Sequence, residues 1–512
     1  MNKPSNNPVV NLALDTIRIN KQALVFVNTR KSAEKEAEEI AKHIKTVDVK
    51  YHETAEKLLK ALSRPTRQCK RLAKCMEKGI VFHHSGLAQK QKDIIETEFR
   101  KGSIKIICCT PTLAMGVDLP AFRVIIRDLK RFGHHGLQWI PVLEYMQQAG
   151  RAGRPSFDTF GEAIAIAKSE SEKETIEDKY VHGEPEPIYS KLAVEPVFRT
   201  YLLSLIAVNF VNDKKSILNF FSKTFWAYQF KDMNKLQYII DKMLSTLEEW
   251  EFIETTGKAD FVSALKLDNV KVKATLLGQR VAQLYIDPLT AHYMIDCLRR
   301  GAAKQLSAFS FLQMVCYTLE MRPLLRVKVK EYDTLNEDYA EYVDSILSNE
   351  PSIYDPDYDD YLSSIKTALF MQDWMDEHDE EDLLEKYSIT PGEIRVKLDV
   401  ADWLLYSSSE LSKLLALQDM IKHVNKTRFR LRYGVKEELL PLLKLKNIGR
   451  VRARKLFRSG IKDLGDVKKA SVTTLAQILG ASVAKDIKEQ LGQEVEEIKP
   501  TKRKGQMSLG KY

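Results

Sequence analysis

Short apolar runs alternate with helical stretches over the first part of the sequence, and this alternation restricts the possible folds more than any other feature. The runs are residues 23–27, 80–82 and 104–109, and the helical stretches between them include residues 32–44 and 89–100. Apolar strands separated by helices predict a parallel sheet wrapped by helices. Because ligands of such sheets gather at the carboxyl ends of the strands, the residues that follow each run are the first candidates for a site.

The composition is that of a soluble, multidomain protein. Of the 512 residues, 44% are hydrophobic and 29% are charged. A chain of this length and hydrophobic content can form three or four hydrophobic cores. Lys and Arg number 79 against 70 Asp and Glu, and the net charge of +9 favours an anionic partner. The basic excess is greatest near the C-terminus.

The cysteine spacing and the lengths of the apolar runs argue against several classes of protein and site. The six cysteines form no CxxC pair and have no histidine at ligand spacing, so neither a zinc site nor a disulfide framework is predicted. No apolar run reaches about 18 residues, and the first residues lack a signal-peptide pattern. We therefore expect a cytoplasmic protein that is neither secreted nor membrane-spanning.

Polar or glycine-containing segments follow each apolar run. After the first run, Ser32 can cap the next helix and Arg30 can meet a phosphate. After the second run, His83 and His84 have no carboxylate or cysteine nearby in sequence to complete a metal-ligand set, so no metal site is predicted. After the third run, residues 110–120 (TPTLAMGVDLP) offer hydroxyls and backbone that can hold a phosphate, although alone they could be an ordinary proline-bounded turn.

The most specific pattern of the chain is QQAGRAGRP at residues 147–155. Its glycines allow close backbone approach, and Arg151 and Arg154 are three residues apart at a helix start, where they can reach a shared phosphate. With the earlier segments, this pattern resembles motifs IV, V and VI of the second RecA-like lobe of superfamily 2 helicases. The resemblance implies that both arginines face the nucleotide held by the other lobe, with Arg154 the better candidate for the arginine finger.

The resemblance also implies further roles in ATP chemistry and DNA contact. An arginine finger contributes about 10³ to 10⁵ in rate, because it neutralises charge that develops on the γ-phosphate. Gln147 would contact the nucleotide or the attacking water, and Thr110 and Thr112 would touch the DNA backbone. The residues expected to lie at the nucleotide or to couple it to the lobe interface are Gly116, Asp118, Gly150 and Gly153.

A phosphate-binding loop is missing from the sequence. No GxxxxGK[ST] occurs, and residues 376–379 (DEHD), the one acidic candidate for Mg²⁺, follow a helical pattern and are predicted to be a solvated helix end. We therefore expect ATP and Mg²⁺ to be held mainly by a first RecA-like lobe of about 150 to 200 residues. A missing segment or a partner chain would supply that lobe, and the chain alone would not hydrolyse ATP.

Between motifs V and VI, residues 123–140 contain two apolar segments around a Gly/His tip, which predicts a β-hairpin. The resembled helicases place a strand-separating hairpin here, and Phe132, His134 and His135 would do that work. An ordinary sheet hairpin is the alternative.

Residues 186–290 contain helical segments and then two strand-like segments around a polar loop, a pattern that suggests a winged helix acting as a structural hinge. Segments of this region also resemble the archaeal Hjm-type helicases. Residues 291–432 are predicted to be helical throughout.

A helix beginning near Pro391 matches the position of the ratchet helix in the resembled family. There Arg395 and Lys397 are candidate phosphate contacts, although the family's usual arginine is replaced by Val396. Trp403 is the candidate for stacking on a base, which is worth about 1 to 3 kcal/mol. A core tryptophan is the alternative for Trp403.

Residues 433–496 predict a helix-hairpin-helix domain. Gly449 with small and apolar residues four and seven positions later makes a tight turn whose amides can meet a phosphate. Sequence-independent DNA contacts are expected from Arg450, Arg452, Arg454 and Lys455. A merely solvated basic face is the alternative.

The last segment, residues 497–512, is predicted to be a flexible tail. Its Gln506, Leu509 and Tyr512 match the spacing of sliding-clamp binding peptides, which makes a sliding clamp a possible partner.

Taken together, the predicted fold is a multidomain α/β plus mostly α chain: one RecA-like parallel-sheet lobe (residues 1–185), a winged helix, a helical ratchet domain and a helix-hairpin-helix. This order resembles the archaeal Hjm helicases, which implies binding to single-stranded DNA and ATP-dependent 3′→5′ unwinding of forked or branched DNA in replication-fork repair and recombination. Two alternatives stay open. One is an exosome-type RNA helicase, which carries an inserted arch that this sequence lacks, and the other is a non-enzymatic DNA-binding protein derived from a helicase.

Overall fold

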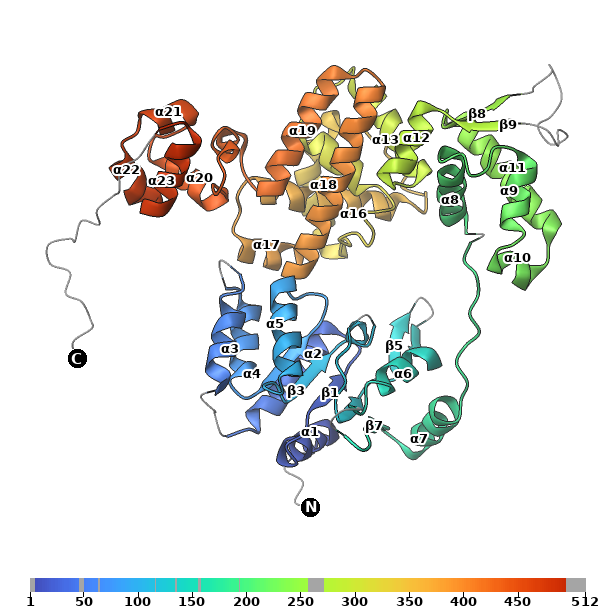
Figure 1. Ribbon diagram of the computed structural model, residues 1–512, viewed down its shortest axis with the longest axis vertical. Coiled ribbons are helices and arrows are strands. Elements are labelled where there is room, and N and C mark those ends of the chain that lie inside the picture. Colours follow the sequence, from blue (N-terminus) through green and yellow to red (C-terminus); the bar gives the residue numbers. More distant parts are fainter. Residues whose placement is uncertain are drawn as a thin grey trace. The chain divides into compact units, whose positions relative to one another are not determined.

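The computed structural model contains the predicted parallel sheet (Figure 1). Its strands are β1 (Ala23–Phe26), β2 (Ile80–His83), β3 (Ile106–Cys109), β4 (Arg123–Ile126) and β7 (Glu162–Ala165). They are hydrogen-bonded in the order β2-β3-β1-β4-β7, and every pairing is parallel. Every residue of β1 to β4 is buried, as expected for strands covered by helices on both faces.

Two units can be distinguished in the chain: Met1–Tyr189 with Ser388–Val396, and Ser190–Tyr387 with Lys397–Tyr512. The structure describes residues 5–45, 50–62, 65–115, 117–133, 136–154, 158–192, 194–256 and 271–493. Gly116, His134, His135, Gln506, Leu509 and Tyr512, for which the sequence suggested roles, lie outside the described residues.

The helices of the first unit pack their apolar residues against the sheet in one core. They are α1 (Pro8–Arg18), α2 (Arg30–Lys42), α3 (Lys50–Leu59), α4 (Arg67–Met76), α5 (Gln89–Arg100), α6 (Val142–Ala149) and α7 (Glu170–Ile176).

The predicted hairpin is shorter than the sequence suggested. β5 (Lys130–Gly133) and β6 (Gly136–Trp139) form an antiparallel two-stranded ribbon. The preceding apolar segment, β4, instead pairs with β1 and β7 inside the main sheet. Its apolar side chains are buried there, and the sequence pattern alone could not distinguish a sheet strand from a hairpin strand.

The second unit begins with helices followed by a two-stranded ribbon, the order expected for a winged helix. The elements are α8 (Glu195–Ala207), α9 (Lys214–Phe221), α10 (Phe225–Phe230), α11 (Met233–Glu249), β8 (Ile253–Thr256), β9 (Lys271–Ala274) and α12 (Leu276–Leu284).

The region after α12 is mostly helical, but the prediction of helix throughout residues 291–432 was too broad. Residues 317–331 and 341–357 contain only loops and short 3₁₀ turns. Pro323, Pro351 and Pro356 fall in these stretches, and proline cannot donate the helical hydrogen bond. The helices are α13 (Pro288–Gly301), α14 (Ala308–Cys316), α15 (Tyr332–Ala340), α16 (Tyr358–Met375), α17 (Glu380–Tyr387), α18 (Pro391–Leu414) and α19 (Gln418–Tyr433).

Four short helices with a core of their own follow: α20 (Arg450–Arg458), α21 (Leu464–Lys469), α22 (Val472–Leu479) and α23 (Ala481–Gln490). Gly449 precedes α20, as the helix-hairpin-helix spacing predicted, and Gly480 joins α22 to α23. Gly480 has φ +93°, a conformation that L side chains rarely adopt.

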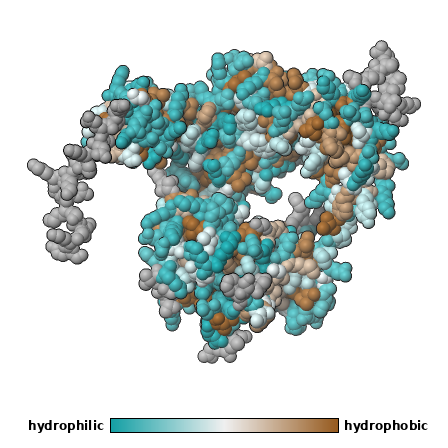
Figure 2. Space-filling model, viewed as in Figure 1, coloured by the Kyte–Doolittle hydropathy of each residue, from teal (hydrophilic) through white to brown (hydrophobic). Residues whose placement is uncertain are grey.

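Hydrophobic residues occur on the visible surface as scattered patches (Figure 2). Among the described helices, none has the length and apolar character needed to cross a bilayer.

Candidate nucleic-acid groove and nucleotide-facing residues

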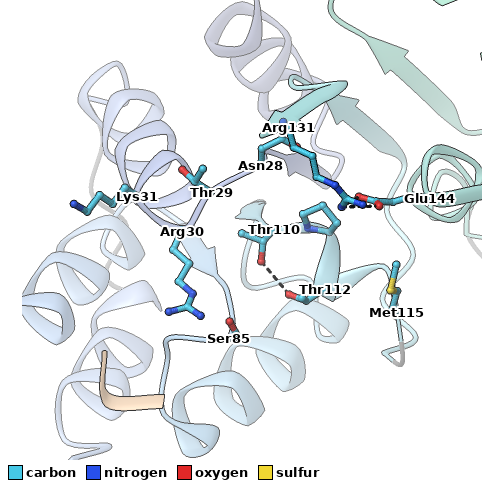
Figure 3. A pocket seen from close by; sticks show the side chains of 11 residues that line it. Asn28, Thr29, Arg30, Lys31, Ser85, Thr110, Thr112, Met115, Arg131 and Glu144 are labelled. Atoms are coloured by element: carbon cyan, nitrogen blue, oxygen red, sulfur yellow. Dashed lines mark hydrogen bonds and ion pairs between the residues drawn. The ribbon is translucent and has the colours of Figure 1, made fainter. Parts of the chain in front are cut away.

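A groove of about 720 Å³ lies in the first unit, among the residues that follow β1, β2 and β3 (Figure 3). The carboxyl ends of these neighbouring parallel strands lie at one edge of the sheet, which is why segments far apart in sequence meet there. Nine of the eleven residues that line the groove have polar side chains: Asn28, Thr29, Arg30, Lys31, Ser85, Thr110, Thr112, Arg131 and Glu144.

The N-terminus of α2 contributes two cations and a helix dipole to the groove. Thr29, not Ser32 as predicted, is the N-cap, and its Oγ1 accepts the Ser32 backbone N–H at 3.1 Å. Arg30 and Lys31 form the first turn, which contains no acidic residue. A helix N-terminus with cations beside it favours an anion such as a phosphate.

Thr110 and Thr112 stand together across the groove from Arg30, as Figure 3 shows. Their hydroxyls lie 2.9 Å apart, and the segment after β3 turns through a 3₁₀ helix, Pro111–Leu113. The structure therefore brings together three of the predicted DNA contacts: Arg30, Thr110 and Thr112. Hydroxyls and cations of this kind bind a phosphate backbone without recognising base sequence.

Carboxylates already partner two of the cations in the groove. Arg131 lies 2.8 Å from a carboxylate oxygen of Glu144, and Arg30 lies 2.5 Å from Glu393 Oε1. Burial alone would raise the pKa of Glu393, but the hydrogen bonds from Arg30 and Thr390 lower it. A phosphate in the groove would therefore compete with Glu393 for Arg30, while the exposed Lys31 adds positive charge.

The motif around Gln147 lies at the end of α6. Gln147 and Gly150 are exposed, and Gly150 is the C-cap of the helix. Arg151 donates to the Ala114 carbonyl at 2.6 Å and lies 3.5 Å from Asp118, whose side chain is 91% exposed. Two residues predicted to act near the nucleotide, Arg151 and Asp118, are thus neighbours at the surface of the unit.

Arg154 has a different environment from the one expected for an arginine finger. Its Nε donates to Asp158 at 2.7 Å and its Nη1 donates to Gln22 Oε1 at 2.7 Å. The Asp158 side chain is 1% exposed, also pairs with Lys21, and has its pKa lowered to about 2, chiefly by the hydrogen bond from Arg154. In this structure Arg154 is an anchor within the lobe.

Gly153 is required for the local backbone path rather than for approach to a ligand. Its φ is +92°, and its N–H donates to the Ala121 carbonyl at 2.7 Å. A Cβ on the neighbouring Gly161 would lie 2.2 Å from the Gly153 nitrogen. Two chain segments therefore touch here with no room for a side chain on Gly161.

On α18 the predicted DNA contacts separate into exposed and buried groups. Arg395 is exposed, but Lys397 is 8% exposed and its Nζ donates to the Pro323 carbonyl at 2.6 Å, so its assignment as a phosphate contact is wrong for this structure. Trp403 is half-buried and donates its indole N–H to the Leu284 carbonyl at 3.0 Å. This geometry favours the core alternative for Trp403.

The basic residues of α20 also divide into two groups. Arg452 is exposed and donates to the Asn447 carbonyl at 2.7 Å, and Lys455 is exposed. Arg450 lies over the Trp374 ring at 5.1 Å and donates to the His378 carbonyl. Gly449 has open space where a Cβ would project.

Arg454 was assigned to DNA, and the structure corrects this. It is 19% exposed and binds both carboxylate oxygens of Glu377, at 2.7 and 2.6 Å, and Glu438 at 2.9 Å. Burial tends to raise the pKa of Glu377, but these bonds lower it. Residues 376–379 do follow the end of a helix, α16, as predicted, but Glu377 is not simply solvated, because it accepts hydrogen bonds from Arg454.

Some groove residues were missed by the sequence reasoning. Asn28, Thr29, Lys31, Ser85 and Arg131 line the groove but were given no DNA role. The first four could have been identified from their position in the sequence, because they directly follow the ends of strands β1 and β2. Arg131 could be found only from the position of the β5–β6 ribbon.

Four family models match the chain in succession. They are the helicase conserved C-terminal domain at residues 7–156, a helix-turn-helix domain at 161–254, archaeal helicase domain 4 at 309–434, and a SAM-like helix-hairpin-helix tandem at 439–493. The predicted fold class is confirmed by the RecA-like sheet and these matches.

Curated relatives match over nearly the whole chain. The ATP-dependent DNA helicase Hel308 of Pyrococcus horikoshii is 37% identical over 500 residues, covering 96% of this chain and 67% of the relative. The protein of the same name from Methanococcus vannielii is 36% identical over 523 residues, covering 95% and 68%. The chain spans about two thirds of the length of these relatives. It therefore belongs to the Hel308 family of archaeal helicases, which confirms the resemblance drawn from motifs IV to VI.

Proposed function

We propose that this chain provides the second motor lobe and the DNA-handling domains of an ATP-dependent DNA helicase. The enzyme would move 3′→5′ on forked or branched DNA in replication-fork repair and recombination. The observation that carries this proposal is the groove, where Arg30, Thr110 and Thr112 meet at the carboxyl ends of parallel strands. Family membership supports the reaction, because the relatives are named ATP-dependent DNA helicases. The polarity and the fork substrate rest on the resemblance drawn from the sequence.

In this proposal the groove holds a phosphate of the tracked single strand. The hydroxyls of Thr110 and Thr112 donate to phosphate oxygens, and the α2 N-terminus with Lys31 supplies positive potential. Arg30 breaks its ion pair with Glu393 and binds the phosphate instead. None of these contacts depends on base identity, as a translocating enzyme requires.

ATP and Mg²⁺ would be bound mainly by a lobe that contains GxxxxGK[ST], a pattern absent from the present sequence. Gln147, Gly150, Arg151 and Asp118 are the residues of this chain that we place at the nucleotide. Arg151 is the better candidate for contact with the γ-phosphate, because Arg154 is held by Asp158 and Gln22. The chain alone should therefore not turn over ATP.

The β5–β6 ribbon is the proposed strand separator. Phe132 is 83% exposed and pairs directly with Leu137, which is 58% exposed. Two apolar side chains opposite each other on an exposed ribbon can insert between base pairs at the fork.

The helix-hairpin-helix domain would add backbone contacts through the Gly449 turn, Arg452 and Lys455. The winged helix is proposed as a hinge. A sliding clamp remains a proposed partner through Gln506, Leu509 and Tyr512.

Fluorescence anisotropy with a labelled single-stranded oligonucleotide tests the groove. The double variant Thr110→Ala/Thr112→Ala should bind about tenfold more weakly, since two solvent-accessible hydrogen bonds with a net contribution of about 0.7 kcal/mol each amount to about 1.4 kcal/mol. Thr97→Ala on α5, outside the groove lining, is the control. Equal affinity of all three proteins would contradict the proposed site, and preference for an RNA oligonucleotide would favour an RNA helicase.

ATPase and fork-unwinding assays of the chain mixed with a candidate first lobe test the enzyme. Turnover should need both components, and Arg151→Ala should abolish it while leaving DNA affinity nearly unchanged. Forks with a 3′ or a 5′ tail report the polarity. Continued inactivity of the mixture, together with normal DNA binding, would instead favour a non-enzymatic DNA-binding protein.

A further inference from the structure

A buried carboxylate lies behind the groove. Glu34 is on α2, the helix whose first turn supplies Arg30 and Lys31, and its side chain is 11% exposed. Gln68 donates to its Oε1 at 2.7 Å, and Arg71 donates to its Oε2. Burial alone would raise the pKa of Glu34, but its hydrogen bonds, first that with His84, lower it to about 2. Glu34 is therefore ionised at neutral pH.

The third partner of Glu34 is His84, a fully buried residue directly after β2. The Nε2 of His84 lies 3.2 Å from Glu34 Oε1, and its Nδ1 lies 3.1 Å from the backbone nitrogen of Gly86. Because a backbone N–H can only donate, Nδ1 must be the acceptor. The ring proton then lies on Nε2, where the carboxylate accepts it, so Glu34 selects both the tautomer and the orientation of the ring.

The turn that His84 holds is also fixed on its other side. The Gly86 carbonyl accepts the Gly392 N–H at 3.1 Å. A Cβ on Gly392 would lie 2.3 Å from the Ser85 carbonyl oxygen. Ser85 itself is exposed and lines the groove (Figure 3). The exposed Ser85 hydroxyl therefore lies on a backbone turn that is held by His84 on one side and by Gly392 on the other.

We propose that Glu34 is a positioning residue for DNA binding. Acting through His84, it sets the Ser85–Gly86 turn so that the Ser85 hydroxyl faces a phosphate of the strand in the groove. The inference rests on the proposed function of the groove, which it deepens by adding Ser85 as a contact and Glu34 as the residue that orients it.

Arg71 supplies a matched control, because it pairs with two carboxylates. It binds Glu34 and also Glu38, and only Glu34 contacts His84. If Glu34 merely stabilised the lobe through Arg71, Glu34→Gln and Glu38→Gln would behave alike.

A double-mutant cycle on single-stranded DNA affinity tests the proposal. Ser85→Ala should weaken binding about fivefold, the cost of roughly one hydrogen bond to a phosphate. Glu34→Gln should weaken binding by a similar factor in the parent protein but cause no further loss in the Ser85→Ala background. Glu38→Gln should leave affinity unchanged in both backgrounds.

A second variant covers the case in which Glu34→Gln folds poorly. In His84→Asn the amide oxygen can accept the N–H two residues later, as in an Asx turn, without needing Glu34. In the His84→Asn background, Glu34→Gln should therefore cause no further loss of DNA affinity. Nitrogen chemical shifts of labelled histidine should show a non-protonated Nδ1 for His84 in the parent and a mixture of tautomers in Glu34→Gln.

Two results would overturn the positioning role: equal losses from Glu34→Gln with and without the Ser85 hydroxyl, or equal losses from Glu34→Gln and Glu38→Gln. These differ from failure of the groove itself. If Thr110→Ala and Ser85→Ala both bound DNA as the parent does, the proposed function of the groove would be wrong, whatever the His84 tautomer.

Discussion

Asp158→Asn should destabilise the RecA-like lobe and free Arg154. The fall of the Asp158 pKa from 3.8 to about 2 corresponds to about 2 kcal/mol, because one pH unit is worth about 1.4 kcal/mol. The side chain is 1% exposed, so solvent screening removes little of this. The folded-state pKa is lowered, so the stabilisation is complete above the unfolded value of 3.8 and is lost as pH falls through about 2.

Hydrogen exchange measured by mass spectrometry can detect this loss of stability in peptides that cover β1 and β4. A loss of about 2 kcal/mol should speed exchange of their most protected amides about 30-fold at neutral pH, and the difference between variant and parent should shrink toward pH 2. Glu170→Gln is the control, since Glu170 forms an exposed i,i+3 pair with Lys173 that solvent screens. Parent-like exchange in Asp158→Asn would refute the view that Arg154 is an anchor.

Four further variants test the assignment of individual side chains. Glu393→Gln should bind single-stranded DNA about threefold more tightly, because phosphate no longer competes with a carboxylate for Arg30, and anisotropy titration against the parent would show it. Arg452→Gln should reduce the slope of log affinity against log salt by about 1, whereas Arg454→Gln should leave that slope unchanged and lower the melting temperature of the domain. Trp403→Phe should cost about 1 kcal/mol in denaturant unfolding through loss of its bond to the Leu284 carbonyl, with DNA affinity unaltered; weaker DNA binding at equal stability would return Trp403 to a stacking role.

The sequence predicted β1, β2 and β3 well because these strands are continuous apolar runs, and continuous runs mark strands buried on both faces. The same logic failed for β4, whose apolar run was grouped with the ribbon that follows it. Pairing partners decide between a sheet strand and a hairpin strand, and β4 pairs with strands that are distant in sequence. The short strand β7 lies in an apolar run of alanine and isoleucine, residues 163–167, which the sequence reasoning passed over, and the strand is only partly buried.

The candidate site shows a similar division. Arg30, Thr110 and Thr112 were found because they follow strand ends, and parallel topology carries such positions to one edge of the sheet. Lys397 and Arg454 were misassigned because their partners, Pro323 and Glu377, lie 74 and 77 residues away in sequence. Composition and spacing show that a cationic side chain is present. Only the three-dimensional structure shows whether a carboxylate or a carbonyl already binds it.

This distinction bears on how strongly DNA binding should depend on salt. The salt slope reflects the counterions that leave the DNA when protein cations neutralise its phosphates, and a cation that keeps its carboxylate partner neutralises phosphate less, so it contributes less to the slope. In the groove, Arg30 must give up Glu393 before it binds phosphate, while Lys31 is exposed. Binding there should therefore rely on hydroxyl and helix-terminus contacts more than the number of basic residues suggests, and those short-range contacts hold one phosphate at a defined position along the strand.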